Sequence, residues 1–135
     1  MKLGQKATLL RRMLDAGGGL MIFEWRKLDG YSLLSLAEVT RLAARFEDAF
    51  LEGKRCALEG MDESIVQVVR HGATTLLCVM NESHQPMQYR IPLPAAAGAG
   101  SEFYSGRRVD AGEEITCDLA PGDAAVYVLG PRTSR

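Results

Sequence analysis

The chain has 135 residues, 47% of them hydrophobic and 24% charged, which is typical of a globular protein with room for one domain or two very small ones. A net charge of −1 and the lack of a basic stripe argue against a nucleic-acid-binding protein. No apolar run approaches the roughly 18 residues of a membrane span, and the first residues lack the apolar core of a signal peptide. We therefore expect a cytoplasmic protein that binds neither nucleic acid nor membrane.

The three cysteines, Cys56, Cys78 and Cys117, are spaced like neither a zinc site nor a redox motif. An odd number of cysteines in a chain without a signal peptide agrees with a reducing compartment. Cys78 and Cys117 fall in predicted strands, so we interpret them as small buried hydrophobic residues. A disulfide between these two is the alternative.

The first part of the chain predicts a helix followed by a strand. Residues 5–15 place four apolar side chains on one helical face, and the glycine run at 17–19 then ends the helix. Residues 20–25, LMIFEW, form a short apolar run typical of a buried strand in a parallel sheet. Residues 26–31 follow as a loop that carries an Asp-Gly turn signal.

A second helix is predicted over residues 35–52. Ser35 and Glu38 match a capping box, in which the serine side chain accepts a hydrogen bond from a backbone amide and the glutamate reaches back. Apolar residues then recur every three or four positions, and Gly53 stands where the helix should end.

The chain changes character near residue 58, after which short strands and turns predominate. A hairpin is predicted from strands at 64–70 and 74–81, joined by His71-Gly72. Further strands are expected at 87–93, 102–105, 113–119 and 124–129, with a flexible loop at 94–100, PAAAGAG. About six or seven antiparallel strands in so short a stretch predict a small sandwich or barrel. The predicted fold class is α+β, with a helix-strand-helix segment at 1–57 and an antiparallel β-sandwich domain at 58–135.

Several segments share their pattern with a known group of enzymes. The segment VVRHGATTLLCVMNES (68–83) has a strand, a Gly turn and a strand that ends in Asn. In EFYSGRRV (102–109) a short strand runs into a Ser-Gly turn, and ITCDLAPGDAAVYVLG (115–130) is a hairpin with a Pro-Gly turn. These segments resemble the C-terminal β-sandwich domain that follows the (β/α)8 barrel of many glycoside hydrolases.

The first half of the chain fits the same resemblance. GGGLMIFEWRKLDG (17–30) is similar to a last barrel strand with its loop, and residues 32–53 are similar to the last barrel helix. The resemblance implies that the chain is the C-terminal end of such an enzyme. It would be a truncated or split piece, because a whole barrel needs about 250 residues.

The resemblance also implies where a substrate would lie. Glu24 stands at the carboxyl end of the proposed barrel strand, the end that faces the active site in such barrels. Glu24 would then bind a sugar hydroxyl, Trp25 would stack on a pyranose ring, and Tyr31 would line the same pocket. The competing interpretations are an ion-paired Glu24 at a strand end and core packing of the two aromatic residues. Glycoside hydrolysis needs two carboxyl groups roughly 5–10 Å apart, and the sequence offers no catalytic pair.

Other residues with chemical potential are interpreted as structural. His71 and His84 are expected in turns, without an acidic or cysteine partner at a metal-ligand spacing. The glycine run follows a helix, whereas a phosphate-binding loop leads into one. Ser35 and Ser105 lie in no nucleophile motif. The sequence therefore predicts neither a metal nor a cofactor.

Three functions are compatible with the sequence. The first is a non-catalytic accessory β-domain of a carbohydrate-active enzyme, with carbohydrate bound through the parent barrel and an apolar face of residues 5–53 left exposed. The second is a free-standing carbohydrate-binding module, although the β-rich half has few aromatic residues, namely Tyr89, Phe103, Tyr104 and Tyr127. The third is a non-enzymatic interaction protein that self-associates through the apolar faces of residues 5–53.

Overall fold

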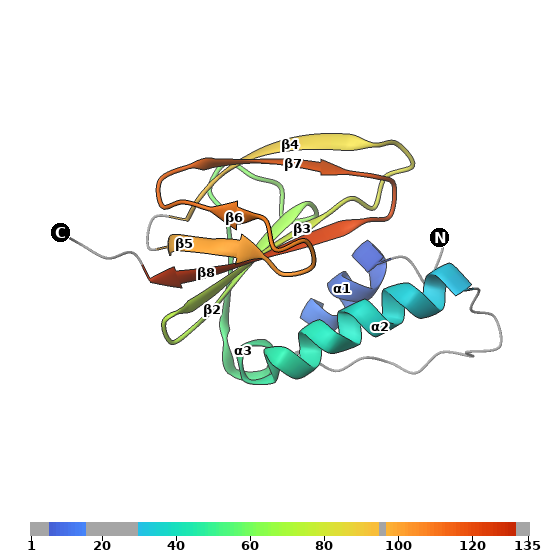
Figure 1. The fold of residues 1–135 in the computed structure, drawn as a ribbon, viewed down its shortest axis with the longest axis horizontal. Coiled ribbons are helices and arrows are strands. Elements are labelled where there is room, and N and C mark those ends of the chain that lie inside the picture. The colour runs from blue at the N-terminus through green and yellow to red at the C-terminus, as the bar shows by residue number, and fades with distance from the viewer. Residues whose placement is uncertain (1–5, 16–29, 95–96, 132–135) are drawn as a thin grey trace.

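A computed structural model describes residues 6–15, 30–94 and 97–131, and for residues 30–33 it describes the backbone alone. The elements form three layers, which are a group of helices, a six-stranded sheet and a two-stranded sheet (Figure 1). All strand pairs are antiparallel. The predicted α+β class with a β-sandwich is therefore confirmed. The strand predicted at 20–25 lies outside the described residues.

The helices are α1 (Lys6–Asp15), α2 (Gly30–Arg45) and α3 (Glu47–Glu52). The prediction for α1 is confirmed, and its apolar face is buried at Leu9, Leu10, Met13 and Leu14. These four side chains recur at the spacing that places them on one side of a helix, which explains why this segment folds as one.

The capping box predicted at Ser35 is wrong. Helix α2 already begins at Gly30, so Ser35 lies inside the helix, where its side chain is 4% exposed. The residues between these two positions include neither proline nor a second glycine, so nothing in the chain prevents the helix from extending toward its N-terminus. A serine is tolerated in a helix interior when the preceding residues favour the helix.

The six-stranded sheet begins with β1 (Lys54–Ala57), β2 (Val66–His71) and β3 (Thr74–Met80). Strands β2 and β3 form the predicted hairpin, and Gly72 at its turn has a φ of 58°, a value that glycine adopts without strain. Strand β1 was not expected, because four residues without apolar alternation give no strand signal. It pairs with β2 along its whole length, from Lys54↔Arg70 to Ala57↔Gln67.

The loop predicted at 94–100 is wrong in its second half, because β5 (Ala97–Glu102) is a strand of the six-stranded sheet. Its small residues allow the strand to lie close to the backbone of the neighbouring strand, which contains Leu129. A Cβ atom on Gly100 would stand 2.8 Å from Leu129 Cα, which is closer than real Cβ atoms come. The strand predicted at 102–105 is accordingly shifted, and the short β6 (Arg108–Val109) pairs with the end of β5.

The two-stranded sheet consists of β4 (Met87–Pro92) and β7 (Glu114–Leu119), which match the predicted strands closely. The last strand, β8 (Ala124–Pro131), lies between β3 and β5 in the six-stranded sheet, whose order is β1-β2-β3-β8-β5-β6. Its side chains alternate between the faces, with Ala125, Tyr127 and Leu129 toward the second sheet and Val126 on the helical face.

Two apolar cores lie on opposite faces of the six-stranded sheet. The first joins the helices to the sheet and contains Leu9, Leu14, Leu42, Phe50, Leu76 and Val126. The second lies between the two sheets and contains Val68, Leu77, Ile91, Ile115, Tyr127 and Leu129. The middle of the sheet is therefore buried on both sides, which explains the continuous apolar runs in β3 and β8.

The sheet covers the apolar face of the helices, whereas we expected that face to be exposed. The first core spans the boundary proposed at residues 57 and 58, since it contains side chains from α1 and α2 together with β3 and β8. Strand β1, at the end of the proposed first segment, belongs to the six-stranded sheet.

All three cysteines are free, so the alternative of a Cys78–Cys117 disulfide is wrong. Cys78 belongs to the core beside the helices and Cys117 to the core between the sheets, so the six-stranded sheet lies between them. Burial raises the pKa of Cys78 to about 12, as expected for a thiol that packs as an apolar side chain.

Candidate functional site

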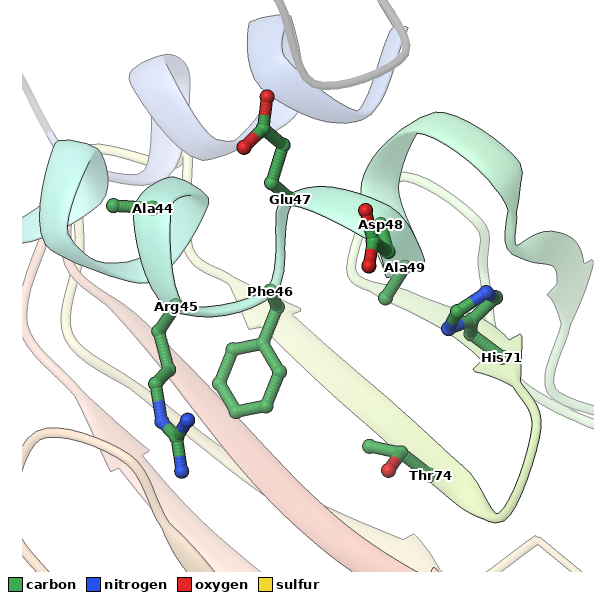
Figure 2. Close-up of a pocket in the computed structure, with 8 residues that line it drawn as sticks. All are labelled: Ala44, Arg45, Phe46, Glu47, Asp48, Ala49, His71 and Thr74. Atoms are coloured by element: carbon green, nitrogen blue, oxygen red, sulfur yellow. The ribbon is translucent and has the colours of Figure 1, made fainter.

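A cavity of about 290 Å³ lies where the helical layer meets the β2–β3 hairpin (Figure 2). We call it the α2–α3 pocket. It is lined by the residues that join the two helices and by two residues of the hairpin: Ala44, Arg45, Phe46, Glu47, Asp48, Ala49, His71 and Thr74. It is therefore built from segments about 25 positions apart in the sequence.

The pocket exists because the helix predicted at 35–52 is broken at Phe46. This residue has φ −124° and ψ 34°, which is outside the helical region, and no side chain caps the start of α3. The hydrogen-bond ladders of the two helices meet at this residue. The Phe46 amide donates to Leu42 O at 3.0 Å, and the Phe46 carbonyl accepts from the amide of Phe50 at 3.1 Å. Phe46 therefore separates α2 from α3.

The wall of the pocket combines an aromatic ring with charged groups. The Phe46 ring is half-buried, packs edge-on against Phe103 at 5.8 Å, and has the Arg45 guanidinium 5.7 Å from its centre. In Figure 2 the Phe46 ring and the Arg45 side chain extend on the same side of the chain, toward Thr74.

His71 stands on the other side of the pocket and is paired with a carboxylate. Its Nε2 atom is 3.7 Å from Oε2 of Glu52, and the two side chains are 38% and 74% exposed. A pair this open to solvent contributes little to stability. It does hold the imidazole near the end of α3.

The pocket is not arranged for glycoside hydrolysis. Its two carboxylates, Glu47 and Asp48, are neighbours in the sequence and both are exposed to solvent. Figure 2 shows the Glu47 side chain directed away from His71 and Thr74. A catalytic pair needs two carboxyl groups that face each other across the bond to be cleaved, with one of them shielded from water. The chemistry that this pocket offers is binding, by hydrogen bonds and contact with a ring.

A second cavity, of about 340 Å³, lies at the end of the two-stranded sheet and is less suited to a ligand. It is lined by Pro86, Met87, Gln88, Asp118, Leu119 and Ala120. Its two polar side chains already bond to each other, from Gln88 Nε2 to Asp118 Oδ1 at 2.9 Å. A ligand would therefore have to replace that bond.

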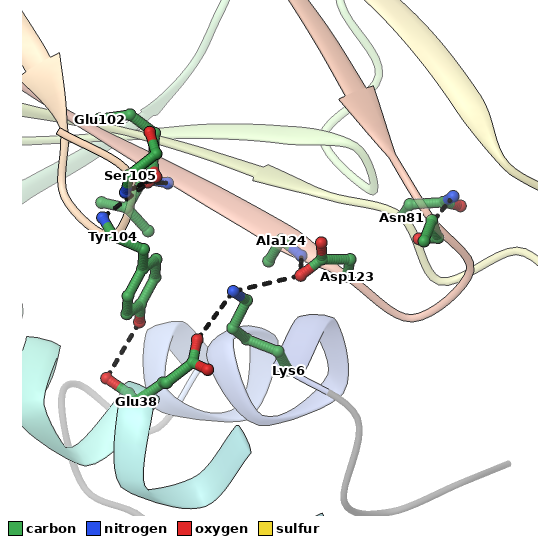
Figure 3. Close-up of polar contacts among 10 residues, drawn as sticks. Lys6, Glu38, Asn81, Glu102, Tyr104, Ser105, Asp123 and Ala124 are labelled. Atoms are coloured by element: carbon green, nitrogen blue, oxygen red, sulfur yellow. Dashed lines mark hydrogen bonds and ion pairs between the residues drawn. The ribbon is translucent and has the colours of Figure 1, made fainter. Parts of the chain in front are cut away.

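Polar contacts fix the helical layer to the sheet (Figure 3). The Lys6 ammonium lies 2.9 Å from Glu38 Oε2 and 3.2 Å from Asp123 Oδ1, and it also stands 4.3 Å from the centre of the Tyr104 ring. Burial lowers the pKa of Lys6, but the two carboxylates outweigh it, so that the pKa is raised overall. The Tyr104 hydroxyl donates a hydrogen bond to the backbone oxygen of Glu38 at 3.0 Å.

Two buried polar side chains organise the turns near these contacts. Glu102, which is 7% exposed, accepts hydrogen bonds from the amides of Tyr104, Ser105 and Val126 at 2.8–3.0 Å. Asn81 donates hydrogen bonds to the backbone oxygens of Gln85, Leu119 and Ala120. Both side chains are hydrogen-bonded within the turns, mainly to backbone groups, so we assign them structural roles.

The sequence-predicted site lies mostly outside the described residues. Glu24 and Trp25 fall in the segment that the structure leaves undescribed, and Tyr31 lies in the first turn of α2, where the structure describes the backbone alone. The expectation that these three residues face a substrate therefore stays a prediction. The α2–α3 pocket was missed, since neither a glycine nor a proline marks the helix break.

Neither a metal-binding cluster nor a membrane-spanning helix is found among the described residues. Within them, no group of three or more His, Cys, Asp or Glu side chains is placed to hold a metal ion. No helix in the same part of the chain is long and apolar enough to cross a membrane.

No family model matches the sequence, and no curated protein matches it. Solved structures do match the fold. An Anoxybacillus α-amylase has a TM-score of 0.57 at 16% identity over 86% of this chain and 25% of its own. An isomalto-dextranase from Arthrobacter globiformis, solved with panose, has a TM-score of 0.60 at 18% identity over 99% of this chain and 24% of its own.

A putative α-galactosidase from Bacteroides fragilis has a TM-score of 0.63 at 12% identity, over 93% of this chain and 28% of its own. The chain thus spans about a quarter of the length of the structures it matches. At these identities the likeness concerns the fold, and the fold is one that glycoside hydrolases contain as part of a larger chain.

Proposed function

We propose that the chain is a non-catalytic accessory part of a carbohydrate-active enzyme, the C-terminal β-domain together with the last helices of its barrel. The observation that carries the proposal is the coverage of the fold match. Nearly the whole chain matches glycoside hydrolases, and it accounts for about a quarter of each of them. The active site of the parent enzyme would then lie mainly in the other three quarters, and this chain would support the barrel and form one wall beside it.

The chemistry of the described residues supports an accessory role. Two buried polar side chains, Glu102 and Asn81, are hydrogen-bonded to backbone groups. The carboxylates of the α2–α3 pocket are exposed and lie side by side in the sequence. A glycosidase mechanism needs two facing carboxyl groups, and the sequence predicts no such partner for Glu24.

The proposal is tested by incubating the purified chain with a panel of aryl glycosides. We expect no release of the aryl group above the level of the buffer. The Glu24→Gln variant, purified in the same way, controls for contaminating glycosidases. Turnover that follows the protein through purification and is lost in Glu24→Gln would overturn the non-catalytic role.

A free-standing carbohydrate-binding module is a weaker candidate. Such modules present a row of exposed aromatic rings to a polysaccharide. Throughout the part of the chain whose side chains are described, the aromatic residues are buried or half-buried: Phe46, Phe50, Tyr89, Phe103, Tyr104 and Tyr127. Calorimetric titration with a monosaccharide and a heptasaccharide separates the two cases. An affinity that rises steeply with the length of the sugar would favour the binding module.

A self-associating interaction protein is the third candidate. The large apolar side chains left exposed on the described helices are Leu34 and Leu51, at 59% and 60% exposure. Isolated exposed residues of this kind are common on monomers, whereas an interface needs a continuous patch. Sedimentation at increasing protein concentration measures the state directly, and a dimer would favour this candidate.

We propose that the protein is located in the cytoplasm. The three free cysteines support this placement, because buried thiols persist as thiols in a reducing compartment. Localisation of the tagged chain by fractionation would test it.

A further inference from the structure

We propose that the α2–α3 pocket binds a single neutral sugar ring. The inference deepens the proposed function and takes the class of ligand, a carbohydrate, from it. The pocket itself is defined independently by the cavity between the α2–α3 break and the β2–β3 hairpin.

Phe46 provides the apolar surface for such a ring. Its ring packs against Phe103 in an edge-to-face arrangement, with the ring centres 5.8 Å apart and an interplanar angle of 68°. Figure 2 shows it projecting into the space between Arg45 and Thr74. A pyranose has an apolar face of C–H groups that packs on an aromatic ring, while its hydroxyls point outward to polar partners.

The polar groups around Phe46 suit a ligand that both donates and accepts hydrogen bonds. The Arg45 guanidinium is a donor, Asp48 is an acceptor, and the Thr74 hydroxyl is both. Sugar hydroxyls can satisfy all three. Arg45 and Asp48 bring charges of both signs to the space. A strongly charged ligand would meet repulsion from one of them, which favours a neutral ligand.

The size of the cavity limits the ligand to one ring. About 290 Å³ stands at the lower end of the volumes of small-molecule sites. The lining residues Arg45, Glu47 and Asp48 are exposed, so the pocket is open and removes only part of a ligand from water. We therefore expect binding in the millimolar range, in keeping with the small number of ligand atoms that make contact.

The test is a titration of the full chain with methyl α-D-glucopyranoside, followed through the backbone amide resonances. We expect saturable shifts in residues 44–49 and at His71 and Thr74. Sorbitol, which carries hydroxyls but no ring, should bind more weakly because it cannot pack a flat face on Phe46. Equal affinity for sorbitol, or no saturable shift with the glucoside, overturns the proposal.

Variants locate the site. Arg45→Met removes the donor from an exposed position and should lower the affinity about three- to tenfold, as expected for the loss of one ordinary hydrogen bond that is open to solvent. Arg90→Met, at an exposed position of β4 on the other sheet, is the matched control and should bind like the parent. Phe46→Leu should also weaken binding. If that variant does not fold, Thr74→Val at the hairpin takes its place. Unchanged affinity in Arg45→Met, or shifts centred away from the pocket, would refute the assignment.

The two proposals fail in different ways. If the chain shows no glycosidase activity and does not bind the glucoside, the sugar-binding pocket is refuted and the accessory role stands. If the chain hydrolyses aryl glycosides, the non-catalytic accessory role is refuted, whatever the pocket binds.

Discussion

Lys6 connects three elements that lie far apart in the sequence. Its ammonium group is paired with Glu38 of α2 and with Asp123 in the turn before β8, and it lies over the ring of Tyr104. The side chain is 13% exposed, so these contacts are partly shielded from water. Lys6 therefore helps to fix the position of α1 against α2 and against the turn before β8.

The Lys6→Met variant should be less stable than the parent by about 1 kcal/mol near neutral pH, since it keeps the apolar stem and loses the charge. The pKa of Lys6 is raised in the folded state above its usual 10.5. The stabilisation is therefore fully present below pH 10.5 and is lost as the pH rises through the folded pKa. Urea denaturation at several pH values should show the two proteins converging in strongly alkaline solution.

Lys54→Met, at an exposed position on the edge strand β1, is the control for this measurement. It should be nearly neutral at all pH values, because an exposed lysine gains little from folding. A Lys6→Met variant whose deficit does not change with pH would contradict the role of the ion pairs.

At the level of single residues, the sequence predicted burial better than it predicted the site. The apolar positions of α1 follow from periodicity, which depends on local geometry alone. The pocket depends on a helix break at Phe46 and on the approach of His71 and Thr74 from a distant hairpin. Tertiary packing determines both the helix break and the approach of the hairpin. The spacing of residues within one segment cannot predict either of them.

Strand β8 is the element on which both cores depend. It lies between β3 and β5, with Val126 at 0% exposure in one core and Leu129 at 1% in the other. The six residue pairs from Thr75↔Leu129 to Met80↔Ala124 join it to β3. Substitution in this strand is therefore expected to affect the whole sandwich.

Val126→Asp should destabilise the protein by more than about 4 kcal/mol, because it places a charge in an apolar core without a partner. Most domains have only about 5–15 kcal/mol of stability, so the variant should be largely unfolded. Thermal denaturation followed by circular dichroism measures the effect. Ala73→Asp, in the exposed turn of the β2–β3 hairpin, introduces the same residue and should melt within a few degrees of the parent. If both variants melt alike, the position of Val126 is wrong.

The elements that sequence reasoning missed share a physical cause. Strand β1 is four residues long with a polar start, and β5 consists largely of alanine and glycine. Both are strands because a neighbouring strand offers them a place, with β2 beside the first and β8 beside the second. Strand propensity depends on packing as much as on the residue type, so a weakly patterned segment can still pair when a neighbouring strand is in place.

At the scale of the whole molecule, the helices and the six-stranded sheet share one core. We propose that segment 1–57 corresponds to the end of the barrel of a larger enzyme and segment 58–135 to its β-sandwich domain. The shared core, with Leu14 and Val39 from the helices and Leu76 and Val126 from the sheet, predicts that both segments unfold together.

Hydrogen exchange read by mass spectrometry tests this cooperativity. The amides of α1 and β8 should exchange through the same global opening and lose protection at the same urea concentration. Limited proteolysis provides an independent readout. Rapid removal of residues 1–57 with survival of 62–130 would show that the β-sandwich is autonomous and that the helices are attached to it loosely.

The overall class could be predicted because it depends on the change of pattern near residue 58, from mainly helical spacing before it to short strands after it. The layer order could not. Which face of the sheet receives the helices is decided by the fit of α1 and α2 on β3 and β8, where residues more than 100 positions apart meet, as in the backbone hydrogen bond from Ala7 to Gly122.

The central place of β8 also constrains the order in which the protein can be made. During synthesis β3 and β5 leave the ribosome before β8, the strand that lies between them in the folded sheet. Until β8 has emerged, each of the two has one unpaired edge and exposed apolar side chains. The six-stranded sheet can close only after residues 124–131 have emerged, and the helices find their full binding surface at the same moment. A nascent chain shorter than this has exposed edges of the kind that pair with other chains, and is the form most in need of a chaperone.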